Sequence, residues 1–259
     1  MAFVNHPTKN LAIKVVYYGP GLSGKTTNLR FIYFKIDPSS RGEFVCLETE
    51  TERTFFFDLL PIRAGFINDY RIHFQLLTVP GQVFYEASRK SVLKGADGII
   101  FVADSQIPLI DANIESFDGL RQNLFDYNMD INRIPLVFQY NKRDLSNLVP
   151  VETFNNLLNP RRVPFIEASA INGVGVFETL KEISKLTVPD VKEKVFGIKR
   201  EVKPKVEERV VIREKKRDEV EFLSTSEETP IQLRKIKFRS YDDIEKEIET
   251  LEKEFMKKI

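Results

Sequence analysis

The sequence has almost no cysteine. Its 259 residues include a single one, Cys46, so no disulfide framework can form, which fits a reducing compartment. Cys46 stands just before an acidic stretch, where an ordinary loop residue is a simpler interpretation than a nucleophile. A small secreted fold held together by disulfides is therefore excluded.

Long apolar runs are also missing. No run approaches the ~20 residues of a membrane span, and residues 1–10 lack the apolar core of a signal peptide. Position 2 is not glycine, and residues 256–259 are no prenylation box, so we expect no membrane anchor and a soluble cytoplasmic protein. The net charge of +1 gives no reason to expect a nucleic-acid partner.

The charged residues divide the chain near Pro189. Residues 1–188 hold 20 Lys/Arg and 20 Asp/Glu, whereas the much shorter segment 189–259 holds 19 and 18. All but one of the glycines come before this boundary. We predict a compact domain over residues 1–188 and a charged C-terminal extension over residues 189–259.

Strands and helices alternate within residues 1–188. Apolar runs predict strands at 11–18, 53–62, 71–79, 98–103, 135–140 and 163–168, with a turn through Gly65, Asn68 and Asp69 between the second and the third. Spacings of three and four predict helices at 25–36, 86–95 and 110–124, and a last helix with Val176, Leu180 and Ile183 on one side. This alternation predicts an α/β fold, with a mostly parallel sheet and helices on both faces.

A glycine-rich loop lies between the first strand and the first helix. It matches G-x-x-x-x-G-K-[ST] in the context that this motif requires. The glycines let backbone N–H groups surround an anion, and the helix N-terminus adds its positive end. Lys25 supplies a charge for the β- and γ-phosphates, and Thr26 supplies a hydroxyl for Mg²⁺. Although a plain glycine-rich turn is the alternative, we predict phosphate binding by Gly19, Gly21, Leu22, Ser23, Gly24, Lys25, Thr26 and Thr27.

A second motif, N-K-R-D, directly follows a predicted strand. The carboxylate of Asp144 can accept from the ring N–H and the exocyclic amine of guanine. Adenine lacks those donors and would leave the carboxylate unpaired. Lys142 can lay its methylene stem over the base, and Asn141 can tie neighbouring loops together. After the following strand, Ser169 and Ala170 can bring N–H groups to the guanine carbonyl. Standing alone, such a tetrad is usually a solvated turn.

The run T-V-P-G-Q at the end of the third strand predicts a switch region. Gly81 brings its N–H towards the γ-phosphate, and Gln82 can orient the attacking water. Phosphoryl transfer depends on positioning and charge compensation. We predict Thr54 as a second hydroxyl on Mg²⁺ and Arg53 as an arginine finger from the same chain. The alternatives are a turn glutamine and a surface arginine.

Together these motifs resemble the bacterial gliding-motility Ras-like GTPases, the MglA family, over about residues 1–188. The resemblance rests on G-P-G-L-S-G-K-T-T-N-L, the segment from Arg53 to Asp58, T-V-P-G-Q-V-F-Y, F-V-A-D-S and Q-Y-N-K-R-D. It implies a P-loop small G domain. Its most specific element is T-V-P-G-Q, because most small GTPases carry an aspartate where Thr78 stands. That aspartate normally holds Mg²⁺ through water, and Asp58 is a candidate substitute here.

The resemblance also implies a biological role. It implies a switch that hydrolyses GTP to GDP with Mg²⁺ and controls cell polarity or gliding motility, with recruitment to a cell pole. It implies activation by a roadblock-type homodimer of the MglB kind, which grips the switch face, and a GTP-dependent slide of the second strand. Arg53, Thr54 and Gln82 fall on the family's functional positions.

The extension departs from the family, whose members usually end after the last domain helix. Near its end, the apolar spacing predicts an amphipathic helix through Tyr241, Ile244, Ile248, Leu251 and Phe255. This helix can associate with itself, bind an effector, pack on its own domain or fray. Segments 206–216 and 231–238 can pair as strands, although charge runs are usually solvated faces.

Two other classes of function stay open from the sequence. In the first, the nucleotide is structural and the extension recruits partners, because Thr78 in place of an acid can weaken metal binding. In the second, the chain is an ATP-using P-loop enzyme such as a kinase, although no acceptor site is recognisable and N-K-R-D favours guanine.

Overall fold

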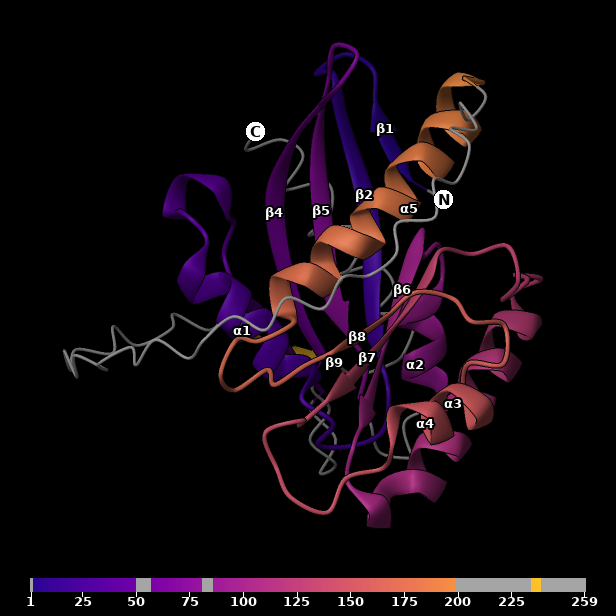
Figure 1. Ribbon diagram of the computed structural model, residues 1–259. Coiled ribbons are helices and arrows are strands. Elements are labelled where there is room, and N and C mark those ends of the chain that lie inside the picture. Colours follow the sequence, from indigo (N-terminus) through magenta and orange to yellow (C-terminus); the bar gives the residue numbers. More distant parts are fainter. Residues whose placement is uncertain (1, 50–56, 81–85, 199–233, 239–259) are drawn as a thin grey trace, which may run out of the picture.

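The structure is a computed structural model that describes residues 2–49, 57–80, 86–198 and 234–238 (Figure 1). The described elements are β1 (Phe3–Asn5), β2 (Asn10–Tyr18), α1 (Lys25–Lys35), η1 (Pro38–Ser40), β3 (Val45–Thr49), β4 (Phe57–Ile67), β5 (Tyr70–Thr78), α2 (Glu86–Leu93), β6 (Gly98–Asp104), η3 (Ile107–Leu109), α3 (Ile110–Asp126), β7 (Leu136–Asn141), α4 (Val151–Leu157), β8 (Phe165–Glu167), α5 (Val176–Phe196) and β9 (Arg234–Phe238). None of the helices in this part of the chain is long and apolar enough to cross a membrane.

The described strands form one sheet in the order β8-β7-β6-β2-β5-β4-β3-β9, and β1 pairs with β2 outside this path. Strands β5, β2, β6, β7 and β8 are mutually parallel along this order. Strands β4 and β5 form an antiparallel pair joined by a tight turn, and β3 is antiparallel to β4. The predicted α/β fold, with a mostly parallel sheet and helices on both faces, is therefore confirmed.

Two apolar cores lie on opposite faces of the sheet, because successive side chains of a strand point to opposite sides. Val15 and Tyr17 of β2 share one core with Leu29 of α1 and Ile183 of α5. On the opposite face, the second core contains Tyr18 together with side chains of α2, α3 and α4. Figure 1 shows α1 and α5 on one side of the sheet and α2, α3 and α4 on the other. Every residue of β2 is buried, as a strand covered on both faces requires.

The turn between the second and third predicted strands is shorter in the structure than the sequence predicted. Gly65 lies inside β4 and not in the turn, because the β4–β5 register shifts between Arg63 and Phe66. At Gly65 the backbone has φ +96°, a conformation that glycine adopts without strain and that suits a bulge. Residues 68 and 69 alone make the turn, with Asn68 at φ 51°.

The last helix is longer than the charge pattern suggests. Helix α5 contains Pro189 and continues to Phe196, so the boundary placed at residue 188 falls inside it. Val191 beyond that proline is 1% exposed and belongs to the core, so its packing offsets the hydrogen bond that proline cannot make. The helix ends at Gly197, whose φ of 68° is typical of a glycine C-cap.

Of the extension, the structure describes residues 234–238. They form β9, which pairs in parallel with β3. The sequence allowed segments 206–216 and 231–238 to pair as strands, although a solvated charge run was the usual alternative; within 231–238, the described residues pair with β3. Residues 206–216 and the terminal helix predicted from Tyr241 to Phe255 lie outside the described residues. The short strands β1 and β3 were not predicted from the sequence.

Candidate functional site

The predicted site loops follow the carboxyl ends of parallel strands of the sheet. The glycine-rich loop follows β2, Asn141 ends β7, and Ser169 and Ala170 come just after β8. Parallel strands present these ends at one edge of the sheet, where α/β proteins bind their ligands. Segments more than a hundred residues apart in the sequence therefore meet at a single site.

The glycine-rich loop approaches neighbouring backbone too closely for a side chain at its first position. Gly19 has φ +145°, and a Cβ there would lie 2.2 Å from the carbonyl oxygen of Val102 in β6. Ser23 is fully buried, whereas Leu22 is 91% exposed. Gly21 lies between Pro20 and Leu22 and is partly buried. The loop is thus held against β6 while its inner side faces the start of α1.

Lys25 is the buried cation of this loop. Its ammonium donates to the carbonyl oxygens of Gly19, at 2.9 Å, and Pro20, at 2.6 Å. Burial, with the nearby charge of Arg89, lowers the pKa of Lys25 from 10.5 to about 7, and the carboxylate of Asp58 opposes this shift. An anionic group beside the ammonium would offset the cost of burying its charge.

Helix α1 begins at Lys25 and carries no acidic side chain in its first turn. Its open N–H groups and helix dipole therefore favour an anion at this end. The helix is fixed by Asn28, whose side chain donates to the Gly24 carbonyl and exchanges two hydrogen bonds with Gln139 of β7, at 2.8 and 2.9 Å. Gln139 also donates to Thr179 of α5. This buried amide network was not predicted, since polar residues in a helix and a strand carry no periodic signal.

Asn141 joins the glycine-rich loop to the loop after β8. Its amide nitrogen donates to the Ser23 carbonyl at 2.7 Å, and its oxygen accepts from the Ala170 N–H at 2.8 Å. A Cβ at Gly24, which has φ +99°, would lie 2.2 Å from that amide nitrogen. Asn141 is 2% exposed, so both of its bonds lie in a buried environment where losing a partner is costly.

A cavity of about 270 Å³ opens between these loops. Its lining comes from the predicted nucleotide-binding loops and includes Leu22, Gly24, Thr27, Asn141, Lys142, Asp144 and Ala170. The carboxylate of Asp144 is exposed at this cavity. Ser169 lies behind the lining, where its backbone pairs with Val174. The cavity is lined by both apolar and polar side chains of these loops.

Lys142 is oriented by an acid that sequence reasoning did not assign to the site. Its ammonium lies 2.6 Å from Oδ2 of Asp104, at the carboxyl end of β6. Asp104 is 1% exposed, so the ion pair is largely shielded from water. Asp104 stands in the run F-V-A-D-S, and its place after a buried apolar run was the available signal. The pair fixes the direction in which the Lys142 stem crosses the cavity.

Asp58 of β4 is the candidate substitute for the acid that is missing at Thr78. Its Oδ2 accepts hydrogen bonds from the hydroxyls of Thr26, at 2.7 Å, and Thr78, at 3.0 Å. The Thr78 hydroxyl in turn accepts from the Asp58 N–H at 2.8 Å. Asp58 is 3% exposed. The strand pair β4–β5 therefore presents a carboxylate to the Thr26 hydroxyl although β5 itself carries none there.

The comparisons with known proteins agree with this geometry. Residues 14–189 match the model of the Ras family. The chain belongs to the Ras family. Over 193 residues it is 52% identical to the mutual gliding-motility protein MglA of Myxococcus xanthus (strain DK1622), an alignment that covers 74% of this chain and 99% of that protein. As a Ras-family member the chain is a small GTPase that binds GTP and GDP, as the resemblance implied.

The predicted hydrolytic residues of this Ras-family GTPase are not among those that the structure describes. Arg53 and Thr54 fall in segment 50–56, and Gly81 and Gln82 fall in segment 81–85, both outside the described residues. The first described residue after segment 50–56 is Phe57, which precedes Asp58, and the last described residue before segment 81–85 is Pro80. Asp58, four residues after Thr54 in the sequence, bonds to the Thr26 hydroxyl.

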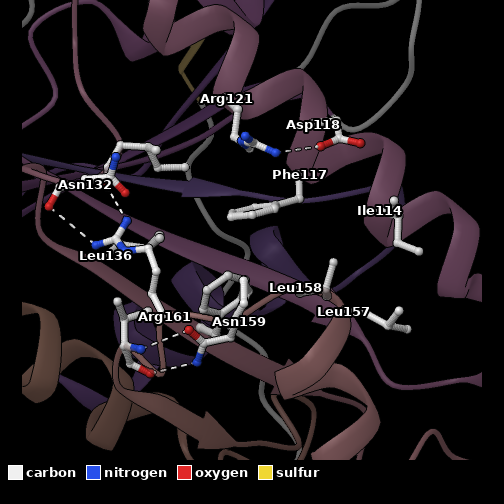
Figure 2. A pocket seen from close by; sticks show the side chains of 14 residues that line it. Ile114, Phe117, Asp118, Arg121, Asn132, Leu136, Leu157, Leu158, Asn159 and Arg161 are labelled. Atoms are coloured by element: carbon white, nitrogen blue, oxygen red, sulfur yellow. Dashed lines mark hydrogen bonds and ion pairs between the residues drawn. The ribbon is translucent and has the colours of Figure 1, made fainter.

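A second cavity of the Ras-family domain, of about 240 Å³, lies away from the nucleotide loops. Figure 2 shows Phe117 of α3 and Leu158, at the end of α4, facing it, with Arg161 at one side. The guanidinium of Arg161 donates to the carbonyls of Ile131 and Asn132 and so holds the segment before β7. None of the predicted nucleotide-binding residues lines this cavity, so it is separate from the candidate site.

Proposed function

We propose that this small GTPase is a GTP-hydrolysing switch that controls gliding motility or cell polarity in a bacterium. The observation that carries this proposal is the 52% identity to the mutual gliding-motility protein MglA along 99% of that protein. We infer a cytoplasmic protein that is recruited to a cell pole, and a functional division between the G domain and the charged extension.

We propose that the glycine-rich loop and the first turn of α1 hold the phosphates of the nucleotide. The open N–H groups of the loop and of residues Lys25 to Thr27 would donate to the phosphate oxygens. The Lys25 ammonium, which bonds to loop carbonyls, would turn to the β- and γ-phosphates, whose negative charge suits a buried cation. This exchange replaces neutral acceptors by charged ones and strengthens the bonds.

We propose that the cavity beside Asn141 holds guanine. Asp144 would accept from the two guanine donors, and the Lys142 stem, directed by its ion pair with Asp104, would cover one face of the base. To donate to the guanine carbonyl, the Ala170 N–H would exchange its bond to Asn141, and the Ser169 N–H would exchange its bond to the Val174 carbonyl. Adenine would leave the Asp144 carboxylate without its donors, which disfavours ATP.

The residues present fit Mg²⁺. A threonine hydroxyl and a carboxylate 2.7 Å apart are the hard oxygen ligands that this ion prefers, and it usually keeps several waters. Thr26 and Thr54 would hold it directly, and Asp58 would steady it in the role of the aspartate that Thr78 replaces. When bound, Mg²⁺ neutralises charge on the β- and γ-phosphates. The carboxylate of Asp58 weakens the case for a chain that merely holds nucleotide.

We propose that Gln82 and Arg53 carry the hydrolytic step. Gln82 would orient the attacking water, and the Gly81 N–H would approach the γ-phosphate. Arg53 would compensate the negative charge that develops as the bond to the leaving oxygen breaks. Both residues lie in segments that flank strands β4 and β5, which would couple them to the nucleotide state.

We propose that a roadblock-type homodimer of the MglB kind activates hydrolysis by binding the switch face. The test is binding of such a homodimer to the full chain loaded with a non-hydrolysable GTP analogue or with GDP. Preferential binding of the GTP-analogue form is expected. Equal affinity for both forms would contradict a switch. The matched control is Arg121→Ala, on the exposed surface of α3 away from the nucleotide loops, which should bind the homodimer like the unchanged protein.

A further inference from the structure

The edge of the sheet beyond β3 is covered by the extension of the same chain. Strand β9 runs parallel to β3 with the register Val45↔Arg234, Leu47↔Ile236 and Thr49↔Phe238. The match to the Ras family ends at residue 189, so β9 lies outside it. The sheet order ends β4-β3-β9, and without β9 the strand β3 would be the edge.

The register brings complementary residue types together. The apolar Leu47 is paired with Ile236, and the acid Glu48 with the base Lys237. Complementary residue types therefore coincide at two paired positions of this register.

The surrounding sequence extends this charge pattern. The segment 43–52 carries four acids and no base before Arg53: Glu43, Glu48, Glu50 and Glu52. The segment 234–239 carries four bases and no acid: Arg234, Lys235, Lys237 and Arg239. The sequence around β3 is thus acidic, and the sequence around β9 is basic.

The connection between α5 and β9 permits pairing within one chain. The described part of the domain ends at residue 198, and residues 199–233 separate it from Arg234. Thirty-five residues can span roughly 115 Å when extended, since each covers ~3.3 Å, which exceeds any distance across a domain of this size. Such a tether raises the local concentration of β9 at the edge to about the millimolar range.

An uncovered edge strand invites pairing with another chain, because its N–H and C=O groups are unpaired. Short, lysine-bearing strands are a usual protection against this. Strand β9 has five residues, and three of them are basic. Strand β9 therefore pairs with the backbone groups of β3, while its own outer edge is poorly suited to pairing with a further strand.

We propose that residues 234–238 are a tethered strand that covers the β3 edge within the same chain and excludes strand-adding partners from it. The partner that this edge fits, once β9 leaves, is an extended segment rich in Lys and Arg that adds a strand by main-chain hydrogen bonds. This inference concerns the sheet edge and does not depend on nucleotide hydrolysis.

The single cysteine of the chain allows a direct test of register. Cys46 is paired with Lys235, and paired positions on neighbouring strands lie about 5 Å apart, within the range that a disulfide bridges. Lys235→Cys should form an intrachain disulfide with Cys46 under mild oxidation. Ile236→Cys is the matched control: successive positions of a strand alternate between the two faces of a sheet, so this variant should cross-link at least ten-fold more slowly.

The cross-linked products are separated on a non-reducing gel and located by mass spectrometry. A fast intrachain bond in Lys235→Cys alone supports the proposal. Equal rates in both variants, no bond in either, or a bond mainly between two chains would overturn it.

The second test disrupts the pairing of β9 with β3. Prolines at both Lys235 and Ile236 must delete one N–H that faces β3, because successive N–H groups along a strand point to opposite edges. Prolines at Ser224 and Thr225 are the matched control in the same extension. The probe is a fluorescent peptide with the sequence of residues 231–240, and its binding to each full-length protein is measured by anisotropy.

The peptide should bind the Lys235→Pro/Ile236→Pro variant at least ten-fold more tightly than the intact chain or the control. Equal binding to all three proteins, or binding to none, would overturn the exclusion of partners. Because the cross-linking test leaves the backbone of β9 unchanged, it keeps the proposal testable if the proline variant fails to fold.

Discussion

Oδ2 of Asp58 lies 2.7 Å from the hydroxyl of Thr26, and this bond joins strand β4 to the first turn of α1. Most small GTPases place an acid on the neighbouring strand, where this chain has Thr78. Thr78 also bonds to Asp58. In our proposal the acid of the metal side is exchanged from β5 to β4, where Asp58 supplies it.

This exchange predicts the effect of removing the acid. Asp58→Asn should raise the Mg²⁺ concentration for half-maximal GTP hydrolysis by about ten-fold, equivalent to about 1.4 kcal/mol, because a neutral amide cannot balance the charge of the ion. The measurement is a Mg²⁺ titration of phosphate release. Adding Thr78→Asp to Asp58→Asn should restore at least part of the lost Mg²⁺ affinity. An unchanged Mg²⁺ requirement in Asp58→Asn would contradict the role given to this carboxylate.

The base cavity predicts a change of nucleotide in Asp144→Asn. An amide can accept from only one guanine donor and turns its own N–H groups towards the other, so GTP affinity should fall by roughly ten- to hundred-fold, or about 1–3 kcal/mol. Xanthine carries a carbonyl where guanine has its amine, so the same variant should gain affinity for xanthosine nucleotides. Competition against a fluorescent GDP measures both. The control Arg143→Lys keeps the charge of the adjacent residue, and an equal loss there would show that the turn itself had changed.

The lowered pKa of Lys25 predicts that the protein takes up a proton when it binds nucleotide. This pKa is lowered to about 7 by burial in the nucleotide-free site, and phosphate anions should raise it again. At about pH 8.5 the free site is then mostly neutral and the complex charged, so binding should take up close to one proton. Affinity should fall as the pH rises above 7. Isothermal titration calorimetry in two buffers of different ionisation enthalpy measures the uptake.

The same shift has a consequence for folding in the absence of nucleotide. Between pH 7 and 10.5 the unfolded chain holds a proton on Lys25 that the folded chain lacks, so the group makes the folded state more stable as the pH rises through this window. Lys25→Arg is the matched control, because a guanidinium keeps its charge throughout. If the Arg variant took up as many protons on nucleotide binding as the unchanged protein, the assignment of that uptake to Lys25 would be contradicted.

The sequence predicted the parts of the site that are contiguous. The glycine-rich loop and N-K-R-D each contain their chemistry within eight residues or fewer, and a strand or helix on each side fixes where they lie. The buried strands β2 and β6 were equally clear, since strands covered on both faces are continuous apolar runs.

The parts that were missed depend on contacts between distant residues. The Lys142–Asp104 ion pair and the Asn28–Gln139 amide pair join elements far apart in the chain, and a lone polar residue gives no sign of its partner. The boundary was placed near Pro189 from the distribution of charges and glycines, but α5 continues past this proline to Phe196, and Val191 is buried beyond it. The pairing of β9 with β3 was likewise invisible, because charge runs more often face water.

The most direct test of the hydrolytic assignment is single-turnover phosphate release from GTP by the full chain with Mg²⁺, alongside Gln82→Ala and Arg53→Ala. Both variants should release phosphate roughly 100-fold more slowly, with GTP affinity nearly unchanged, because the two side chains act only as the bond breaks. Unchanged release in both variants, or a loss of GTP affinity in place of a loss of rate, would contradict it.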